Sequence, residues 1–192
     1  MFTFKAKYLL VTINLILKTL ILLFSYDINA EIISGKATIV DGDTVKIDNK
    51  TIHLHGIDAP EMDQFCSYQN GKRYNCGHAA MRRLFLYIGP DTLECHIRLS
   101  NKDGTLSATC QITSYFTVTE IGVTRGEKID LALEMVLTGH AFAVKYSSTI
   151  YRLAEDKARK ERKGLWSGDF ELPWNWRSRT HAFDRNSEHL EE

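Results

Sequence analysis

The sequence predicts an α+β fold in which a small closed β-barrel is covered by helices. Five or more short strand patterns fall in the first two-thirds of the chain, one helical pattern interrupts them, and two more follow. With 192 residues the chain can form one domain around a single buried core. Closing short strands into a barrel removes exposed sheet edges, and helices then cover the remaining apolar surface.

The first three strands are predicted at residues 33–40, 44–47 and 51–57, where β-branched residues are frequent. The turns between them, "DGD" and "DNK", are rich in aspartate and asparagine, which favour turn geometry. Residues 62–77 are polar and bounded by cysteines, which predicts a loop. Further along, "TLECHIRL" and "TLSATCQI" predict a hairpin, and a β-rich stretch at 114–124 follows.

Three segments, residues 78–89, 128–139 and 148–163, have the apolar spacing of amphipathic helices, and a glycine stands at or just after the end of each. The stripes predicted to be buried are Met81, Leu84, Phe85 and Ile88 in the first helix, Ile129, Leu133, Val136 and Leu137 in the second, and Ile150, Leu153, Ala154 and Ala158 in the third.

Residues 1–30 have the pattern of a signal peptide, with Lys5 and Lys7 before an apolar run and small residues ending at Ala30. We therefore expect an exported protein, periplasmic or secreted, with no stable membrane insertion after processing. The alternative is an uncleaved N-terminal anchor, although Lys18 interrupts the apolar run that a spanning helix needs. The folded domain is then expected at residues 31–177, and residues 178–192 as a disordered tail.

All four cysteines follow residue 30. In an oxidising compartment an even number of cysteines predicts disulfides, here two. The favoured pairs are Cys66–Cys76, which closes a loop, and Cys95–Cys110, which the predicted hairpin brings together. The alternative is a zinc site that recruits a histidine, but the sequence has no C-x-x-C pair and fits no standard zinc module. His55, His78 and His96 are accordingly expected on the surface or on strand faces.

The overall charge does not favour nucleic-acid binding. The chain has 24 basic and 24 acidic residues, and the part after residue 30 has 21 basic and 23 acidic residues, a net charge of −2. Proteins that bind mainly by neutralising phosphates are usually basic. The basic run at 157–163 is typical of the solvated end of a helix. Trp166, Trp174 and Trp176 could stack on bases, but we prefer the interpretation that they anchor the chain end.

Four carboxyl groups, those of Asp41, Asp43, Asp58 and Glu61, are concentrated in one strand-forming stretch. Calcium is a hard cation that binds carboxylate and carbonyl oxygens. Pairing of the strands would bring Asp43 and Asp58 together, and Pro60 favours an extended backbone that directs Glu61 toward the same point. The pattern alone leaves turn chemistry as the alternative, because aspartate commonly stabilises turns.

Two motifs at fixed spacing, "ATIVDGDTVKI" and "IHLHGIDAPE", resemble the staphylococcal nuclease (thermonuclease) family. The likeness continues through "DLALEMVLTGHAFAVKY", "YRLAEDKARKERKGLW" and "GDFELPWNWR" and covers most of residues 36–177. The subgroup that the chain most resembles is exported and has four cysteines. The resemblance implies a five-stranded oligonucleotide-binding-type (OB) barrel with three packed helices, and calcium-dependent phosphodiesterase activity on DNA and RNA.

The resemblance also implies roles for single residues. Asp43 and Asp58 match the metal-ligating aspartates, Ala59 matches a position that ligates through its carbonyl, and Asp41 matches an acidic neighbour of the metal. Glu61 matches the general base that activates the attacking water. Calcium is the expected cofactor, single-stranded DNA or RNA the expected substrate or ligand, and a monomer the expected state.

Two phosphate-binding arginines of the family are replaced, one by His53 and the other by Thr105. A guanidinium forks two hydrogen bonds onto phosphate oxygens and keeps its charge. One such arginine can contribute 10³–10⁵ in rate, or about 4–7 kcal/mol of barrier. Arg98 and Arg125 are candidate substitutes. The chain also carries an insertion around residues 113–127 relative to the family.

Two functions are compatible with this incomplete site. The first is an exported calcium-dependent nuclease of reduced activity, with Glu61 as base; in it, His53 would act at acid pH if protonation partly restores phosphate stabilisation. The second is a non-catalytic module that binds nucleic acid or nucleotides and retains the fold and the metal.

Overall fold

The structure is a computed structural model that describes residues 31–113, 117–119, 122–124, 126 and 128–188, without the side chains of 117–119, 122–124 and 181–188. The predicted signal peptide, residues 1–30, lies outside the described residues. The strands of the main sheet are β1 (Ile32–Gly35), β2 (Ala37–Ile39), β3 (Thr44–Ile47), β4 (Lys50–Leu54), β8 (Leu93–Ser100), β9 (Leu106–Thr113) and β12 (Lys128–Asp130). The shorter strands are β5 (Ile57–Asp58), β6 (Phe65–Tyr68), β7 (Arg73–Asn75), β10 (Thr117–Thr119), β11 (Gly122–Thr124), β13 (Phe142–Ala143) and β14 (Gly168–Asp169). The helices are α2 (Cys76–Ile88), α3 (Leu131–Leu137), α4 (Thr149–Lys160), the 3-10 helix η1 (Gly164–Ser167) and α5 (Pro173–Glu188).

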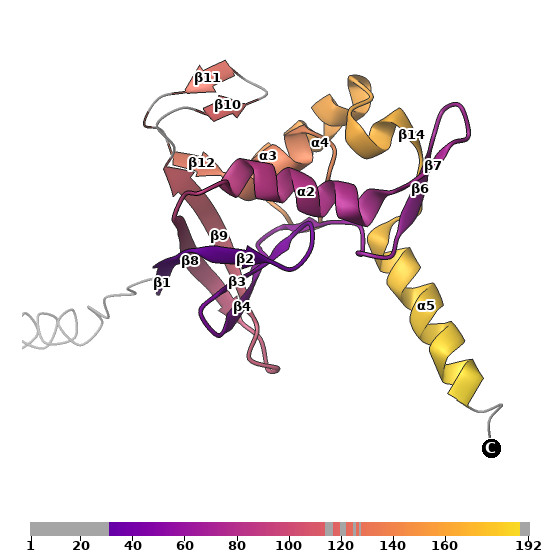
Figure 1. Cartoon of the computed structure of the whole chain (residues 1–192), viewed down its shortest axis with the longest axis horizontal. Helices are drawn as coiled ribbons and strands as arrows, with labels where there is room; N and C mark the ends of the chain where they lie inside the picture. Colours follow the sequence, from indigo (N-terminus) through magenta and orange to yellow (C-terminus); the bar gives the residue numbers. More distant parts are fainter. Residues whose placement is uncertain (1–30, 114–116, 120–121, 125, 127, 189–192) are drawn as a thin grey trace, which may run out of the picture. The chain divides into compact units, whose positions relative to one another are not determined.

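The barrel closes because one bent strand pairs with both ends of the sheet. The strand order is β1-β8-β9-β4-β3-β2, and Lys36 alone separates β1 from β2 in the sequence. β1 pairs antiparallel with β8, β2 pairs antiparallel with β3, and β4 pairs parallel with β9. With β1 and β2 taken as one bent strand, this is the predicted five-stranded OB-type barrel (Figure 1).

The bend leaves no room for a side chain on its inner face. A Cβ added to Gly35 would lie 2.7 Å from Cγ2 of Ile47, so a residue with a side chain would displace the strand beside it. Along β3 and β4 the inward residues Val45, Ile47 and Ile52 are essentially inaccessible to solvent, as the period of two in a half-buried strand requires.

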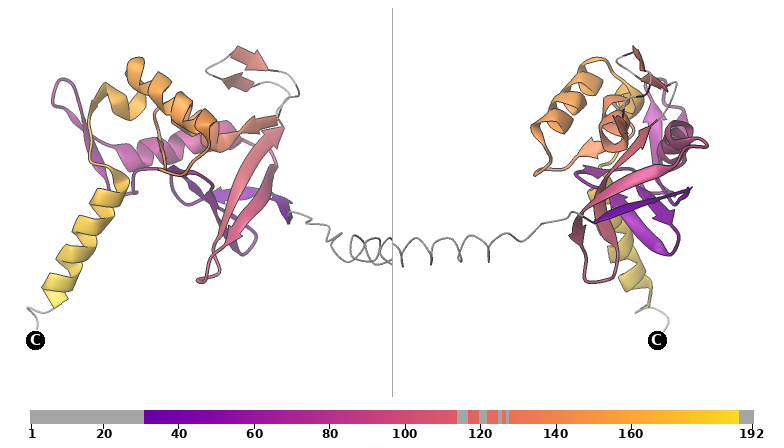
Figure 2. Two further views of the ribbon diagram at one scale, coloured as in Figure 1. Left: turned by 180° about the vertical axis from the view of Figure 1, so that it is seen from behind. Right: turned by 90° about the vertical axis from the view of Figure 1, so that its left-hand side faces the viewer.

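Helices α2 and α3 complete the core, and Figure 2 shows them on the same side of the barrel as α4. Leu84 and Ile88 of α2 and Met135 and Val136 of α3 are buried against the barrel strands. Asn75 caps α2 by accepting a hydrogen bond from the His78 amide (2.7 Å), a common way to satisfy a free donor at a helix start.

The three predicted helices are present, but two of the predicted stripes are partly wrong. Phe85 of α2 is 58% exposed, and Ile150 and Leu153 of α4 are 55% and 62% exposed. In α4 the buried side is that of Tyr151, whose hydroxyl donates a hydrogen bond to Asp130 (2.7 Å). This bond holds the helix in a rotation that apolar spacing alone does not predict.

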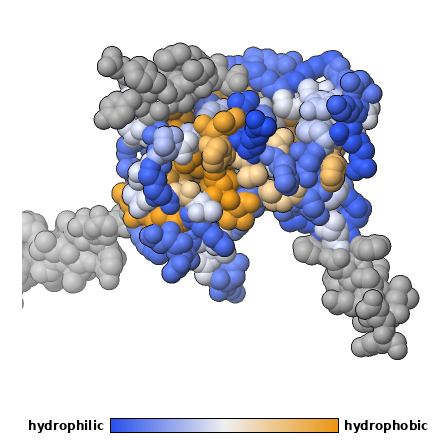
Figure 3. Space-filling model, viewed as in Figure 1, coloured by the Kyte–Doolittle hydropathy of each residue, from blue (hydrophilic) through white to orange (hydrophobic). Residues whose placement is uncertain are grey.

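Apolar residues also reach the surface of the face shown in Figure 3. They gather over α2 and the adjoining strands β1 and β2, whereas the surface over β6 and β7 is mainly hydrophilic. Among the described residues, no helix is both long and apolar enough to span a membrane.

Residues 62–77, predicted as a loop, contain a short hairpin. β6 and β7 pair antiparallel, and β14 adds a third strand from the C-terminal part of the chain. The Cys66–Cys76 disulfide joins β6 to the first residue of α2, and Cys95–Cys110 joins paired positions of β8 and β9. Both favoured pairings are confirmed, and no free cysteine is left for a zinc site.

The insertion contains a second hairpin. β10 and β11 pair antiparallel, and β12 then returns to pair with β9 before α3 begins. The prediction of a β-rich stretch at 114–124 is therefore confirmed at the positions that the structure describes. Figure 1 shows the hairpin beyond the end of β9, next to β12.

An aromatic cluster holds the C-terminal segment. The ring of Phe142 lies 5.4 Å from Trp166, 5.2 Å from Phe170 and 6.0 Å from Trp174, measured between centroids. The indole of Trp176 lies outside this cluster and donates a hydrogen bond to Asp63 (3.2 Å). All three tryptophans thus attach the chain end to the domain.

Helix α5 begins at Pro173, a residue well suited to the first position of a helix because its φ is already helical. The sequence predicts no regular element after residue 177, whereas α5 continues to Glu188. The segment lacks an apolar period, so spacing gave no sign of this helix. Residues 189–192 lie outside the described residues.

The hairpin disulfide is expected to stabilise the barrel. Replacing both Cys95 and Cys110 by alanine should lower the free energy of unfolding by about 3 kcal/mol, because the bond closes a loop of 15 residues in the unfolded chain. Urea denaturation of the oxidised proteins measures this. The double variant at Cys66 and Cys76, whose bond spans 10 residues, should lose a similar amount for the same reason. Equal stability of the Cys95/Cys110 variant and the unmodified protein would contradict the expectation.

Candidate active site

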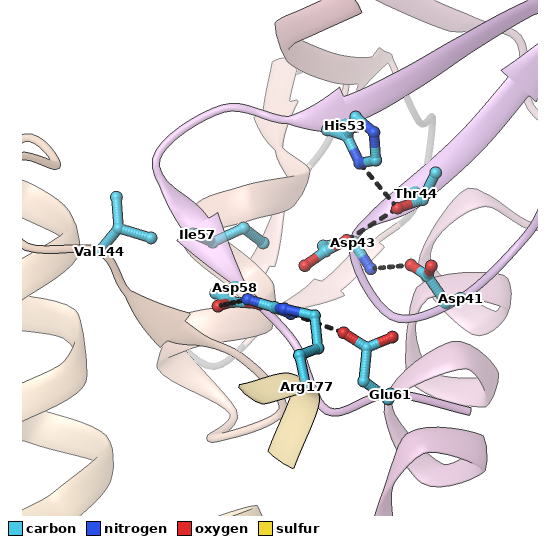
Figure 4. A pocket seen from close by; sticks show the side chains of 9 residues that line it. All are labelled: Asp41, Asp43, Thr44, His53, Ile57, Asp58, Glu61, Val144 and Arg177. Atoms are coloured by element: carbon cyan, nitrogen blue, oxygen red, sulfur yellow. Dashed lines mark hydrogen bonds and ion pairs between the residues drawn. The ribbon is translucent and has the colours of Figure 1, made fainter. Parts of the chain in front are cut away.

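One cavity of about 440 Å³ contains every acidic residue singled out in the sequence. It is lined by Asp41, Asp43, Thr44, His53, Ile57, Asp58, Glu61, Val144 and Arg177. These residues come from the turn after β2, from β3, β4 and β5, from the loop after β5, from the position after β13, and from α5. Figure 4 shows the carboxyl groups of Asp43, Asp58 and Glu61 turned toward a common space.

The turn after β2 places the first two carboxyl groups. The Asp43 amide donates to Oδ1 of Asp41 (3.0 Å), which is the local aspartate bond that favours this turn. The Leu54 amide donates to the Asp43 carbonyl (2.8 Å) and fixes the turn to β4. Gly42 lies against α2, because an added Cβ would come within 2.6 Å of Ala80 Cβ. The turn therefore has little freedom to move.

The end of β5 places the third carboxyl group. Asp58 is paired with Phe142 of β13, and the next amide, that of Ala59, donates to Oδ2 of Asp43 (2.7 Å). This bond joins the two metal-site stretches predicted from the sequence, residues 41–43 and 58–61, across the cavity. Ala59 itself is buried.

The loop after β5 holds Glu61 through its backbone. The Glu61 amide donates to Oε1 of Gln64 (3.2 Å), and Nε2 of Gln64 donates to the Glu171 carbonyl (2.6 Å). Gln64 is fully buried and so links the Glu61 loop to the segment before α5. On the other side, a Cβ at Gly77 of α2 would lie 1.8 Å from the Glu61 carbonyl oxygen. Glu61 thus extends from a rigid backbone while its side chain remains 32% exposed.

His53 lines the cavity from β4. Its Nδ1 lies 3.0 Å from Oγ1 of Thr44, and this hydroxyl donates to Oδ1 of Asp43 (2.8 Å). When the hydroxyl proton of Thr44 is donated to an ionised Asp43, Nδ1 of His53 is the donor in its contact with Thr44. The imidazole is thereby connected to the buried carboxyl through one hydroxyl.

The Arg177 guanidinium is an unpredicted member of the site. Nη1 and Nη2 donate to the two oxygens of Asp58 (3.0 and 2.7 Å), and Nη1 also donates to Oε1 of Glu61 (2.5 Å). These hydrogen bonds, first of all those to Asp58, raise the pKa of Arg177 above its usual value. Forked contacts of this type are among the stronger hydrogen bonds in proteins.

The charges around Asp43 are unfavourable without a cation. Burial raises the pKa of the Asp43 carboxyl to about 8, and the Asp41 carboxylate adds to the increase. Hydrogen bonds from the Ala59 amide and the Thr44 hydroxyl act in the opposite direction but do not cancel it. A carboxyl group so enclosed by other acids is typical of functional sites.

The donor set fits calcium in its chemistry. Four carboxyl groups offer only oxygen, and the buried Asp43 gains most from a nearby positive charge. Among the described residues, however, no group of three or more acidic, histidine or cysteine side chains has an arrangement ready for a metal. Arg177 contributes to this, because its guanidinium holds Asp58 and Glu61 in ion pairs.

Other predicted participants lie elsewhere. The Thr105 hydroxyl donates to Asp103 (2.8 Å) in the exposed turn between β8 and β9, so it does not line the cavity. Arg98 donates to Thr109 on the outside of β8 and is not a substitute for the missing arginines. The other candidate, Arg125, lies outside the described residues.

His55, His78 and His96 do not line this cavity. His55 Nδ1 lies 2.9 Å from the Ser107 hydroxyl, and His96 Nε2 lies 2.8 Å from Glu94. His78 is an exposed residue of α2. These positions agree with the expectation that the three histidines lie on surfaces and strand faces.

Sequence reasoning missed three residues that shape the site: Thr44, Gln64 and Arg177. Thr44 directly follows Asp43 at the start of a predicted strand, and this adjacency is a sequence signal for a hydroxyl beside the carboxyl group. Arg177 ends the "PWNWR" motif, and the expected anchoring of the tryptophans in this motif already implies that the arginine lies close to the domain. Gln64 gives no signal, because its partner lies 107 positions away.

A family model of the staphylococcal nuclease homologues matches residues 51–168, more than half of the chain. The chain belongs to this nuclease family. A relative in Rhizobium meliloti (strain 1021), the succinoglycan biosynthesis protein ExoI, is 25% identical over 147 residues, which cover 76% of this chain and 71% of the relative. The matched part of the nuclease family model includes Asp58 and Glu61, whereas Arg177 lies beyond it.

The contact between α2 and the Glu61 loop can be tested at Gly77. Gly77→Ala should destabilise the protein by about 2–3 kcal/mol, because the new methyl group meets a backbone carbonyl that cannot move aside. Thermal denaturation should show a melting temperature about 5–10 °C lower. His78→Ala changes the exposed neighbouring residue and serves as control; a Gly77→Ala protein as stable as this control would contradict the close contact.

Proposed function

We propose that the protein is a calcium-dependent phosphodiesterase that cleaves DNA or RNA. One observation carries this proposal: Asp43, Asp58 and Glu61, from separate elements of a nuclease-family barrel, line the same cavity. Barrel stability does not require three acidic side chains in one place, and grouping them costs free energy unless a cation is bound.

Asp43 and Asp58 are the proposed calcium ligands, with the Ala59 carbonyl as a further ligand and Asp41 as an acidic neighbour. When bound, calcium supplies Lewis-acid stabilisation of the charge that develops on the phosphoryl oxygens. The hydrogen bonds from Thr44 and Ala59 hold the Asp43 carboxyl in one orientation, which keeps this part of the site preorganised.

Glu61 is the proposed general base. Its carboxylate reaches solvent while its backbone is fixed by Gln64 and by the contact with Gly77, so it can accept a proton from a water molecule at a defined position. In the structure the same carboxylate is paired with Arg177, and this pair must open or shift before Glu61 can act as a base.

His53 cannot replace an arginine in full. A neutral imidazole offers one donor where a guanidinium offers a fork, and Nδ1 is already used toward Thr44. We therefore expect a lower rate of cleavage than in relatives with arginine at this position. His53 keeps a role on the phosphate side of the cavity through its remaining nitrogen.

The second candidate is a non-catalytic module that binds nucleic acid or nucleotides. The observation that favours it is the pairing of Asp58 and Glu61 with Arg177, which occupies the predicted ligand and base at the same time. Binding without cleavage in the presence of calcium would support this function over hydrolysis.

We infer that the protein works in an oxidising compartment as a monomer. The two disulfides support export, because such bonds persist outside the reducing cytoplasm. Single-stranded DNA or RNA is the proposed substrate, since an OB-type barrel offers a surface suited to unpaired strands.

Hydrolysis can be tested with the general base. Glu61→Gln should lower the rate of cleavage of denatured DNA and of RNA by at least about 100-fold, because the amide cannot accept the proton. Fluorescence release from labelled oligonucleotides measures the rate, with calcium and with chelator. Glu171→Gln alters a carboxylate outside the cavity and is the control. Cleavage that persists in chelator, or in Glu61→Gln, would rule out this mechanism.

Calcium binding can be tested separately from cleavage. Asp43→Asn should weaken calcium binding by at least about 10-fold, because calcium affinity depends on the number of charged ligands. Titration calorimetry without nucleic acid measures this directly. Asp169→Asn changes an exposed aspartate of β14 and should bind like the unmodified protein. Equal affinities in the two variants would mean that calcium does not bind at Asp43.

A further inference from the structure

The cavity contains a single group with a fixed positive charge. Of the nine residues that line it, four carry carboxyl groups and only Arg177 carries a guanidinium or ammonium group. A phosphodiester is an anion, and it cannot approach several carboxylates unless positive charge faces it. Among the lining residues, Arg177 is therefore the one whose charge attracts a phosphate.

The hydrogen bonds of Arg177 leave one edge of the guanidinium open. A guanidinium has five N–H donors. Asp58 takes one donor each from Nη1 and Nη2, and Glu61 takes the second donor of Nη1. Nε and the other donor of Nη2 make no hydrogen bond to the described residues. These two donors are parallel and form the pair that binds two phosphate oxygens side by side.

The position of Arg177 does not depend on its ion pairs alone. Before it in the chain, Trp174 packs on Phe142, and the Glu171 carbonyl accepts a hydrogen bond from Gln64. Next to it, the Trp176 indole donates to Oδ1 of Asp63 (3.2 Å). These contacts would keep the start of α5 at the cavity if the carboxylates released the guanidinium. The Arg177 side chain is also 39% exposed, so a ligand can reach it.

We propose that Arg177 is the phosphate-binding residue of this site, taking the place of the arginines that are replaced by His53 and Thr105. This inference rests on the proposed function, because it assigns a substrate contact within the same cavity. The guanidinium approaches from the C-terminal helix, on the side of Asp58 and Glu61 (Figure 4). The forked contact then comes from α5, and His53 can add only a single hydrogen bond through its remaining nitrogen.

The same geometry makes Arg177 and a cation competitors. Both are attracted by Asp58 and Glu61, and two positive groups on one carboxylate repel each other. Calcium bound to Asp58 would therefore weaken the ion pair between Asp58 and Arg177 and leave more of the Arg177 charge available to a phosphate at the open edge. Removing the guanidinium should then strengthen the binding of calcium and weaken the binding of a phosphate.

The test measures two binding equilibria of the purified protein by calorimetry. In Arg177→Gln, calcium alone should bind about 5-fold more tightly or better, since a competitor for Asp58 is lost. A nucleoside 3′,5′-bisphosphate in the presence of calcium should bind about 10- to 100-fold more weakly, because charged hydrogen bonds to phosphate are lost. Arg177→Lys, which keeps the charge without the fork, should lie between the two proteins for the bisphosphate.

Arg179→Gln is the matched control. Arg179 lies two positions further on α5, pairs with Glu171 and does not line the cavity, so both affinities should remain those of the unmodified protein. A single cooperative melting transition in each variant shows that the fold is kept. Weaker binding of both ligands by Arg177→Gln would indicate a structural role only, and unchanged or tighter bisphosphate binding would indicate an inhibitory ion pair; either result overturns the inference.

Cleavage assays separate this inference from the proposed function. If the unmodified protein binds the bisphosphate through Arg177 but cleaves no oligonucleotide, the inference holds and hydrolysis is excluded. If the protein cleaves and Arg177→Gln cleaves equally fast, the inference fails while the proposed function holds. No binding of the bisphosphate by the unmodified protein also overturns the inference.

Discussion

The rest of the structure depends on one bent strand, β1–β2, which pairs with β8 at one end and with β3 at the other. Because β1 and β2 are parts of the same strand, the turn after β2 must emerge beside β4 and β5. The Val40 amide donates to the Thr44 carbonyl (2.9 Å) and completes this turn. The position of the first two carboxyl groups is thus a result of barrel closure and needs no separate scaffold.

The site is an electrostatic exception within an ordinary barrel. Ion pairs on the surface, such as Lys50 with Glu31, contribute little to stability because water screens them. Asp43 is different, since it is buried beside Asp41 and faces further acids. Hydrogen bonds from Thr44 and Ala59 only partly offset this cost for Asp43, and the Arg177 fork acts on Asp58 instead. Such a cluster costs stability, and the proposed phosphodiesterase chemistry explains why the protein tolerates it.

Much of the fold could be predicted because its signals are local. Short β-branched runs between aspartate turns indicated the barrel strands, and the pairing of cysteines across the turn-like "SNKDGT" indicated the β8–β9 hairpin. The rotation of α4 could not be predicted in this way, because it depends on the Tyr151 hydroxyl finding Asp130, a partner 21 positions away. The short β6–β7 hairpin was missed for a similar reason, since β14 supports it from the other end of the chain.

In the candidate site, too, the residues that are close in sequence could be predicted and the distant one could not. Asp41, Asp43, Asp58 and Glu61 lie within 21 positions, and strand pairing was enough to predict that they share a cavity. Arg177 is more than 100 positions away and reaches them through contacts of α5 that have no periodic pattern. Local spacing therefore indicated the acidic half of the site and could not indicate its positive charge.

The parallel pairing of β4 with β9 has a consequence for the order of assembly. Ile52 lies opposite Leu106, so the chain between them, including α2 and all of β8, must be gathered before these strands can meet. Contacts of such long range form slowly, whereas the β8–β9 hairpin requires only a short loop to close. Barrel closure through this parallel pairing is consequently expected after the β8–β9 hairpin has formed.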